Sequence, residues 1–275
     1  MSSQAAWSNE LLLQTRRAFD GVADDYDGPT GNNELIQRMR ERLWRAVEAV
    51  VPPGGRLLDL GCGTGLDASH FARGGYRVVA VDWSPAMVRR TQDRACASGR
   101  SDPISAHTLG IHELGQLSAG RFDGIYSDLG PLNCLPDLTE VARACANLLQ
   151  PGGWLVVSVI GRRCPWEQAY YLLRGDWRRA WLRESKDMVP VRLRGETVWT
   201  RYLTPTELAA AFAEQFDRVS YRALGLLVPP PYLVGLYQRL GPVGQLLGAL
   251  DDRLGSLPLL RDGGDHFLMV LKKRG

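Results

Sequence analysis

Two aspartates and a run of closely spaced glycines carry the clearest chemistry in the chain. Asp59 stands two residues before Gly61, and further glycines follow at Gly63 and Gly65. Glycine lets the backbone turn sharply and approach a ligand closely, and the helix expected after the turn offers unpaired N–H groups to an anionic group. The short apolar run at 56–60 is typical of a buried parallel strand. The sequence therefore predicts a strand, a tight turn and a helix that bind a ligand.

The acidic residues around this turn distinguish between two classes of ligand. The pyrophosphate of a dinucleotide would be repelled by Asp59, and the third glycine of the dinucleotide fingerprint would fall at Leu66. S-adenosylmethionine carries no phosphate, and its ammonium group suits Asp59. Its ribose diol needs a second acid, which the chain supplies at Asp82, the last residue of the run 77–82. These residues favour S-adenosylmethionine as the cofactor.

Four segments resemble, in the same order, the motifs of the class I S-adenosylmethionine-dependent methyltransferases. Residues 57–65 and 77–82 resemble motifs I and II, residues 121–127 resemble the fourth-strand motif, and residues 148–157 resemble the L-x-P-G-G turn into the fifth strand. The resemblance implies an enzyme that transfers a methyl group from S-adenosylmethionine. It also implies an α/β fold with a Rossmann-like seven-stranded, mostly parallel sheet, helices on both faces, an antiparallel last strand and lid-like insertions.

The same resemblance indicates which residues bind the cofactor. Tyr26 matches a tyrosine in an N-terminal segment that folds over the cofactor in many small-molecule methyltransferases, although such a loop is often only a surface turn. Trp83 stands where the family places a residue against the adenine, the alternative being ordinary core packing. Gly110 replaces an aspartate that many relatives have in the adenine loop. The expected cofactor residues are Tyr26, Asp59, Gly61, Cys62, Gly63, Thr64, Gly65, Asp82, Trp83, Met87, Gly110, Ile111 and Ser127.

The acceptor is expected beyond the carboxyl ends of the strands, where open parallel sheets bind ligands. The loop after the fourth strand offers Asp128 and Asn133, which either contact the acceptor or brace the loop. We interpret the insertion at 161–203, rich in tryptophan and arginine, as a lid rather than a surface elaboration. A second insertion at 224–260 is rich in leucine and proline. The expected acceptor-binding residues are Asp128, Asn133, Trp166, Glu167 and Tyr232.

The sequence leaves the catalytic base open. Methyl transfer from a sulfonium mainly requires alignment of the nucleophile with the methyl group, and a hydroxyl or ammonium nucleophile also requires a base. The candidate bases are Asp128, Tyr26, Glu167, His112 and His266. A lone histidine more often has a structural role, so the sequence assigns no catalytic residue. Arg40, on the helix expected at 34–50, is interpreted as solvent-exposed.

Composition indicates a single domain at 1–275, in which residues 1–50 form an N-terminal helical cap. The 275 residues are 45% hydrophobic, enough for a sizeable core. A formal net charge of +3 gives no independent case for nucleic acid, and the fourth strand lacks the N/D-P-P-Y/F motif. We therefore expect a small-molecule acceptor, hydrophobic or lipid-like because the insertions are apolar, methylated on oxygen or nitrogen. The alternative is a non-catalytic regulatory or partner protein that binds S-adenosylmethionine.

Cysteine usage and hydropathy bear on metals and location. The five cysteines show no zinc-ligand spacing, so we expect reduced thiols and no metal. The N-terminus lacks the features of a signal peptide, and no apolar stretch approaches the ~20 residues of a spanning helix. The sequence therefore predicts a cytoplasmic protein, with peripheral membrane contact by the 224–260 segment as an open alternative.

Overall fold

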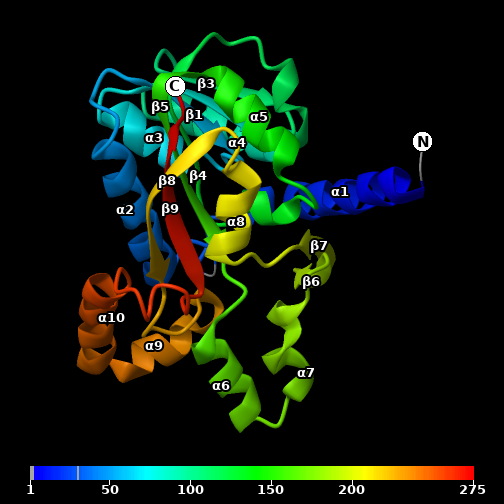
Figure 1. The fold of residues 1–275 in the computed structure, drawn as a ribbon, viewed down its shortest axis with the longest axis vertical. Helices are drawn as coiled ribbons and strands as arrows, with labels where there is room; N and C mark the ends of the chain where they lie inside the picture. The colour runs from blue at the N-terminus through cyan, green and yellow to red at the C-terminus, as the bar shows by residue number, and fades with distance from the viewer. Residues whose placement is uncertain (1–2, 30) are drawn as a thin grey trace.

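A seven-stranded sheet forms the centre of the computed structural model, which describes residues 3–29 and 31–275, with side chains from residue 9 within that range (Figure 1). The strands are β1 (Arg56–Leu60), β2 (Arg77–Asp82), β3 (Ile104–Thr108), β4 (Phe122–Ser127), β5 (Leu149–Ile160), β8 (Phe216–Leu224) and β9 (His266–Lys273). Their order is β3-β2-β1-β4-β5-β9-β8, and β9 runs antiparallel to both neighbours. The pairings from β3 to β5 are parallel. This arrangement confirms the fold class predicted from the sequence.

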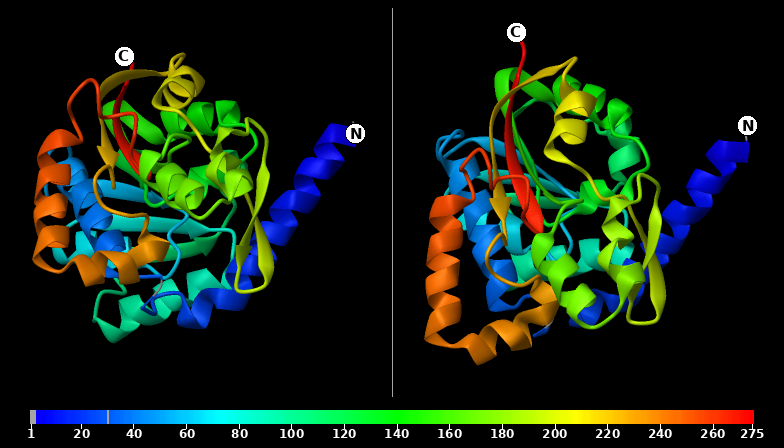
Figure 2. Two further views of the ribbon diagram at one scale, coloured as in Figure 1. Left: turned by 90° about the horizontal axis from the view of Figure 1, so that it is seen from below. Right: turned by 60° about the horizontal axis from the view of Figure 1, so that its bottom comes forward.

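Helices cover both faces of this sheet because its central strands are apolar on both sides. The helices around it are α1 (Ser3–Val22), α2 (Glu34–Glu48), α3 (Leu66–Arg73), α4 (Pro85–Ala97), α5 (Thr139–Leu148) and α8 (Pro205–Phe212). Leu57 faces a core shared with α2 and α3, whereas Leu58 and Leu60 face a core shared with α5 and α8. The N-terminal part of α1 projects from the molecule (Figure 2), whereas its later residues pack against β7 and α4.

Local sequence signals set the starts of two of these helices. Ser84 caps α4 by accepting a hydrogen bond from the N–H of Met87 at 3.1 Å. Thr204 and Glu207 form a reciprocal capping box at the start of α8. In both helices a side chain of the capping residue satisfies a backbone N–H group of the first turn.

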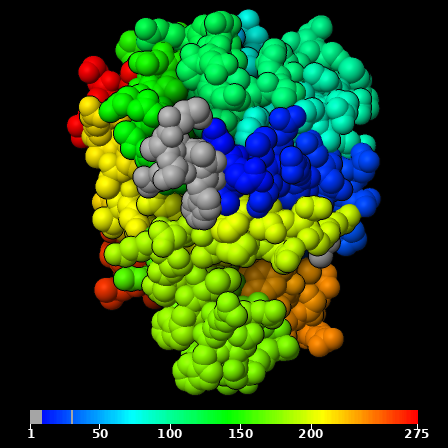
Figure 3. All heavy atoms as spheres, turned by 90° about the vertical axis from the view of Figure 1, so that its right-hand side faces the viewer, coloured from blue at the N-terminus to red at the C-terminus, as the bar shows by residue number. Residues whose placement is uncertain are grey.

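The two insertions add a further layer, visible below the sheet in Figure 1. The first contains α6 (Pro165–Leu173), α7 (Trp177–Ala180), η4 (Leu182–Glu184) and a hairpin of β6 (Val189–Leu193) and β7 (Glu196–Thr200). The second contains η5 (Pro231–Leu233), α9 (Val234–Leu240) and α10 (Pro242–Leu254). The hairpin turns at Gly195, and it lies along α1 (Figure 3). Among the described residues, none of the helices is both long and apolar enough to cross a membrane.

Both insertions leave the sheet at the same edge. Ile160, the last residue of β5, pairs with His266, the first residue of β9, and His266 also pairs with Leu224 at the end of β8. The first insertion begins directly after Ile160, and the second connects Leu224 with His266. The antiparallel register therefore brings both insertions to the carboxyl ends of the parallel strands.

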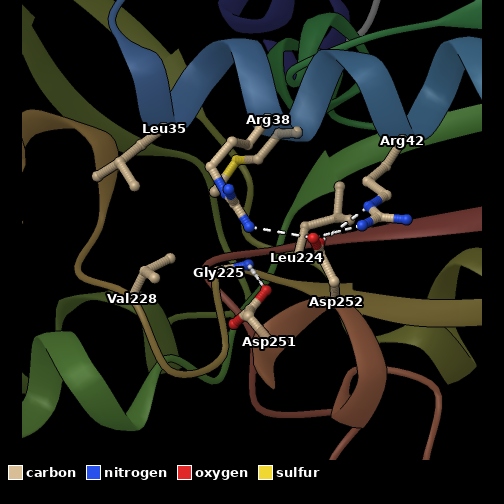
Figure 4. A pocket seen from close by; sticks show the side chains of 9 residues that line it. Leu35, Arg38, Arg42, Leu224, Gly225, Val228, Asp251 and Asp252 are labelled. Atoms are coloured by element: carbon tan, nitrogen blue, oxygen red, sulfur yellow. Dashed lines mark hydrogen bonds and ion pairs between the residues drawn. The ribbon is translucent and has the colours of Figure 1, made fainter. Parts of the chain in front are cut away.

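The second insertion is also anchored to α2, around a small hollow in the surface (Figure 4). Arg38 and Arg42 of α2 converge on Asp252 of α10, with Arg38 at 3.0 Å. The neighbouring Asp251 accepts backbone N–H groups of residues 225–227, at 2.5 to 3.2 Å. These contacts hold α10 against α2, which covers one face of the sheet.

Candidate active site

The glycine turn lies between β1 and α3 and approaches the loop that follows β4. The N–H groups of Gly61 and Cys62 donate to the carbonyl of Val81, at 2.8 and 3.0 Å. Gly61 has a φ of 78°, and a Cβ there would lie 2.4 Å from the Cβ of Pro131. The backbone angle and the close approach therefore both require glycine. Burial is the main cause that raises the pKa of the Cys62 thiol well above its ordinary value, which makes this cysteine unreactive.

Asp82 lies at the end of β2 with its carboxylate directed at the glycine turn. Its oxygens accept hydrogen bonds from the N–H groups of Gly63, at 2.9 Å, and Ser84, at 2.8 Å. Burial raises the pKa of Asp82 to about 6, although these two hydrogen bonds act in the opposite direction. Because a carboxylate oxygen can accept more than one hydrogen bond, each oxygen retains capacity for a hydroxyl group. This is the geometry that the predicted ribose contact requires.

The segment at 26–27 packs over the glycine turn. Thr64 donates its hydroxyl to Asp27 at 2.7 Å, and Arg94 of α4 forms an ion pair with the same carboxylate. The Cε1 atom of Tyr26 lies 4.0 Å from the position of a Cβ on Gly63. Burial raises the pKa of Tyr26 to about 12, so the hydroxyl stays protonated near neutral pH. The ring of Tyr26 lies next to Gly63 of the turn.

Two further predicted cofactor residues support this region. Met87 is buried and packs in the same small apolar cluster as Tyr26 and Phe19. Gly65 is the N-cap of α3 with a φ of 78°, and a Cβ there would lie 2.8 Å from Thr91 of α4. The third glycine thus lets α3 and α4 approach each other below the turn.

Three aspartates and one arginine meet on the α2 face of the sheet. Asp59 is 1% exposed, and its carboxylate faces the hydroxyl of the fully buried Tyr126, which acts to lower the pKa of Asp59 against the larger effect of burial. Asp128 accepts a hydrogen bond from Ser158 at 2.5 Å, and its Oδ2 atom lies 3.8 Å from Arg40. Burial, reinforced by Asp67, raises the pKa of Asp128 to about 6 and that of Asp59 well above its ordinary value. One cation thus faces three buried acids, a balance that a cationic ligand would complete.

Arg40 corrects the sequence analysis. The prediction of a solvent-exposed side chain is wrong, because Arg40 is 8% exposed and forms an ion pair with Asp67 of α3. The same carboxylate accepts a hydrogen bond from the indole of Trp44 at 2.7 Å. Burial would lower the pKa of Arg40, but Asp67 and Asp128 outweigh it and raise that pKa above its ordinary value. An arginine on the edge of an amphipathic helix looks the same in sequence whether it faces water or buried acids.

Trp83 and the expected adenine loop lie next to each other. Trp83 contacts the ring of His112 edge to face, with centroids 4.6 Å apart. A Cβ on Gly110 would lie 2.3 Å from the His112 ring, so His112 occupies the space that an aspartate at 110 would need. Ile111 follows at the start of η2 (Ile111–Gln116) and packs in the core. Stacking of Trp83 on the adenine stays a prediction.

Two of the predicted ligand contacts are used inside the protein. Ser127 is fully buried and donates to the carbonyl of Leu60 at 2.8 Å, which ties β4 to β1. Asn133 is also fully buried, and its amide donates to the carbonyls of Ile160 and Arg201 at 3.0 and 2.7 Å. Both side chains brace the ends of the strands. For Asn133, the bracing alternative describes its position better than acceptor contact does.

The three predicted acceptor residues of the insertions lie where the two insertions meet. Trp166 donates its indole N–H to the carbonyl of Leu227 at 3.1 Å. Tyr232 donates its hydroxyl to Glu167 at 2.6 Å. Glu167 is buried, and Arg183 donates to both of its oxygens, at 2.8 and 2.7 Å. These polar groups bind one another, so their contact with an acceptor stays a prediction.

Arg183 is the residue of this region that the sequence analysis missed. It is 7% exposed and donates to Oδ1 of Asp265 at 2.6 Å, as well as to the carbonyls of Gly161 and Asp265 at 3.1 Å. One arginine of the first insertion therefore joins α6, the end of β5 and the start of β9. In the sequence it stands among charged residues that are typical of a solvated surface, so no local pattern marks it.

The fold is that of the class I methyltransferases, and comparisons with known proteins agree. Residues 32–215 match the family described as "Methyltransferase domain". The chain belongs to this family, the class I S-adenosylmethionine-dependent methyltransferases, and S-adenosylmethionine is its cofactor.

The curated relatives match only part of the chain. A ubiquinone biosynthesis O-methyltransferase of Xanthomonas axonopodis pv. citri is 34% identical over 138 residues, which cover 50% of this chain and 56% of that protein. The chain thus spans about half the length of the curated relatives that it matches.

Two solved structures share the fold. The 1,6-didemethyltoxoflavin-N1-methyltransferase of Burkholderia thailandensis, solved with 1,6-didemethyltoxoflavin and S-adenosylhomocysteine, has a TM-score of 0.59 and 18% identity, covering 97% of this chain and 90% of that one. The CcbJ methyltransferase of Streptomyces caelestis has a TM-score of 0.60 and 17% identity, covering 92% of this chain and 96% of that one. At these identities the similarity shows the fold alone.

Proposed function

We propose that this protein transfers the methyl group of S-adenosylmethionine to a hydroxyl group of a hydrophobic small molecule. The observation that carries the proposal is the meeting of the two insertions at the carboxyl edge of the sheet, where Tyr232 binds Glu167. The minimal sheet would leave this side of the crevice open to water. The insertions supply aromatic and apolar side chains, which suit an apolar acceptor. The O-methyltransferase among its relatives supports oxygen rather than nitrogen as the methylated atom.

The proposed roles follow from the positions of the side chains. Asp82 binds the ribose diol, and Trp83 packs on the adenine. Asp59, a buried acid at the end of β1, receives the ammonium group of the cofactor. Asp128 follows β4 directly and lies beside the methyl group.

Product detection with an isotopically labelled methyl donor tests this function. The purified chain is incubated with labelled S-adenosylmethionine and with separate apolar and polar metabolite extracts, and mass shifts are recorded. We expect a labelled methyl ether from the apolar extract, and no such product from an Asp82→Ala control at equal concentration. A labelled amine, or a product confined to the polar extract, would overturn the proposed acceptor class.

Peripheral contact with a lipid surface is part of the same proposal. The second insertion exposes a set of large apolar side chains, namely Val243, Leu246, Leu257 and Leu259. Exposed apolar side chains on one segment suit contact with a lipid surface. Sedimentation with phospholipid vesicles should therefore capture the protein, and the double variant Leu246→Glu, Leu259→Glu should weaken capture. Val219→Glu, at an exposed apolar site on β8, is the matched control, and equal capture of all three proteins would contradict the contact.

A further inference from the structure

The start of β9 places a histidine beside the proposed point of methyl transfer. His266 pairs with Ile160 at the carboxyl end of β5. Because side chains alternate along strands, His266 points to the same face as Ser158, which binds Asp128. The imidazole is close enough to Asp128 to lower the pKa of that carboxyl, against the larger effect of burial. His266 therefore lies at the edge of the sheet next to the loop that follows β4.

A hydrogen bond to Asp265 fixes the tautomer of this histidine. Nδ1 of His266 lies 2.8 Å from Oδ2 of Asp265, whose other oxygen receives Arg183. Burial alone would raise the pKa of Asp265, but Arg183 and His266 outweigh it and hold this pKa below its ordinary range. An ionised carboxylate only accepts hydrogen bonds, so Nδ1 carries the proton of the neutral ring. Nε2 then keeps its lone pair, and it has no hydrogen-bond partner within the described part of the chain.

We propose that His266 is the catalytic base that deprotonates a hydroxyl acceptor, with Asp265 and Arg183 as positioning residues. The inference rests on the proposed function, since an acceptor without an ionisable hydroxyl would need no such base. The acceptor oxygen attacks the methyl carbon as the bond from carbon to sulfur breaks. The hydroxyl proton passes to Nε2, S-adenosylhomocysteine leaves, and the imidazolium later releases the proton to water. Asp265 stabilises that imidazolium, as in other carboxylate-histidine pairs.

The other candidate bases are less suited to this step. Glu167 is held at both oxygens by Arg183 and also accepts from Tyr232. The pKa of Tyr26, about 12, keeps its hydroxyl protonated near neutral pH. Asp128 is the remaining rival, since its Oδ2 atom has no hydrogen-bond partner within the described residues. That oxygen faces Arg40, however, and lies among acids that suit the cationic cofactor.

Charged groups from several elements lie near His266 and Asp265, and their charges contribute to the pH profile of the reaction. Asp128 approaches from the end of β4, Arg183 from η4 and Glu167 from α6. The variant His266→Gln changes the base and leaves these groups in place.

The test compares acceptor probes that differ in acidity. Catechol is largely protonated at weakly alkaline pH and needs a base, whereas 4-nitrocatechol is already largely ionised. For His266→Gln we expect kcat with catechol to fall by roughly 10²–10⁴-fold, with kcat for 4-nitrocatechol nearly unchanged. The acidic limb of the pH–rate profile with catechol should also disappear. His107→Gln, at an exposed position of β3, is the control for loss of a histidine.

Two further variants test Asp128 as the rival base and Asp265 as a positioning residue. Asp128→Asn should weaken S-adenosylmethionine binding while retaining the difference between the two catechols. Asp265→Asn should lower kcat with catechol, because the imidazolium loses its carboxylate, and leave kcat with 4-nitrocatechol nearly unchanged. If Asp128→Asn abolished the difference between probes and His266→Gln preserved it, the assignment of the base to His266 would be overturned.

A measurement without any acceptor keeps the outcome independent of the proposed function. Imidazole ¹⁵N NMR of the folded full chain should show His266 with Nδ1 protonated and Nε2 unprotonated when the ring is neutral. The opposite tautomer would overturn the role of His266 directly. A third outcome is that the tautomer is as expected and calorimetry shows normal cofactor binding, but neither catechol is methylated. In that case the proposal of a phenolic-hydroxyl acceptor is wrong, and the assignment of His266 as its base is wrong with it.

Discussion

The cofactor half and the acceptor half of this site are built by different means. In the cofactor half, Asp82 binds the N–H groups of Gly63 and Ser84, so consecutive strands of the sheet hold the turn in place. In the acceptor half, Arg183 joins Glu167 and Asp265, which lie 16 and 82 positions away in the chain. The glycine turn of the proposed cofactor half is therefore positioned by the sheet itself, independently of the acceptor. The proposed acceptor half is held by a few buried charges instead, so we expect changes in it to leave cofactor binding undisturbed.

The largest effect is expected from removal of Arg183, which would break the acceptor half alone. Arg183→Met leaves Glu167 and Asp265 buried without their cation, and breaking a buried ion pair in this way costs about 3–5 kcal/mol. Urea unfolding should show this loss, while calorimetry of the folded protein should show cofactor affinity close to that of the unchanged chain. The exposed Arg178→Met is the matched control. An equal, small effect of both substitutions would mean that the cluster does not stabilise the insertions.

Removal of Asp82 should break the cofactor half instead. Asp82→Ala eliminates two charge-assisted hydrogen bonds to the ribose, each worth at least about 1.5 kcal/mol, so affinity should fall about 100-fold. Calorimetry with S-adenosylmethionine measures the change. Asp82→Asn, which can still accept a hydrogen bond from Gly63 or Ser84, separates ribose contact from support of the turn. Normal binding by the alanine variant would show that the carboxylate only supports the turn.

The same contrast explains what the sequence could predict. The sheet, the glycine turn and the acid at 82 follow from local patterns, because adjacent residues form the strand, the turn and the cap. The buried state of Arg40 could not be predicted, since its partners Asp67 and Asp128 come from a different helix and a different strand end. The Asp265–His266 pair depends likewise on Arg183, 82 positions earlier in the chain. Local sequence thus predicts the turn and the acid of the proposed cofactor site, whereas long-range charge pairs hold the proposed acceptor side.

A smaller effect is expected from a single hydroxyl at the boundary between the insertions. Tyr232→Phe keeps the ring but removes the hydrogen bond to Glu167. Because Tyr232 is half exposed, the loss should be about 1 kcal/mol, near the ordinary value for one hydrogen bond. The KM for the acceptor should rise by about fivefold, with no change in the dissociation constant of S-adenosylmethionine. An equal change in both constants would show that the two halves are coupled.

The smallest effect concerns protons taken up by the cofactor half. Burial raises the pKa values of Asp82 and Asp128 to about 6, from an ordinary value of 3.8. These raised pKa values stabilise the folded apoprotein at low pH. This contribution to the free energy of unfolding is lost as pH rises from about 4 through about 6, because in that range the folded state retains protons that the unfolded state has released. The pH dependence of cofactor binding has the opposite direction. Cofactor affinity rises with pH, since the ribose hydroxyls and the positive charges of S-adenosylmethionine favour ionised carboxylates.

Calorimetry can therefore follow proton release as S-adenosylmethionine binds. Two groups with pKa values near 6 are mostly ionised at pH 7 and half protonated at pH 6, so affinity should fall about threefold over that interval. Titrations at pH 6 in buffers of different ionisation enthalpy should show protons released on binding. Asp82→Asn should reduce both the proton release and the pH dependence, whereas Tyr232→Phe, which lies in the acceptor half, should change neither. Proton uptake on binding, or an affinity that rises as pH falls, would contradict the assignment of these carboxylates to the cofactor.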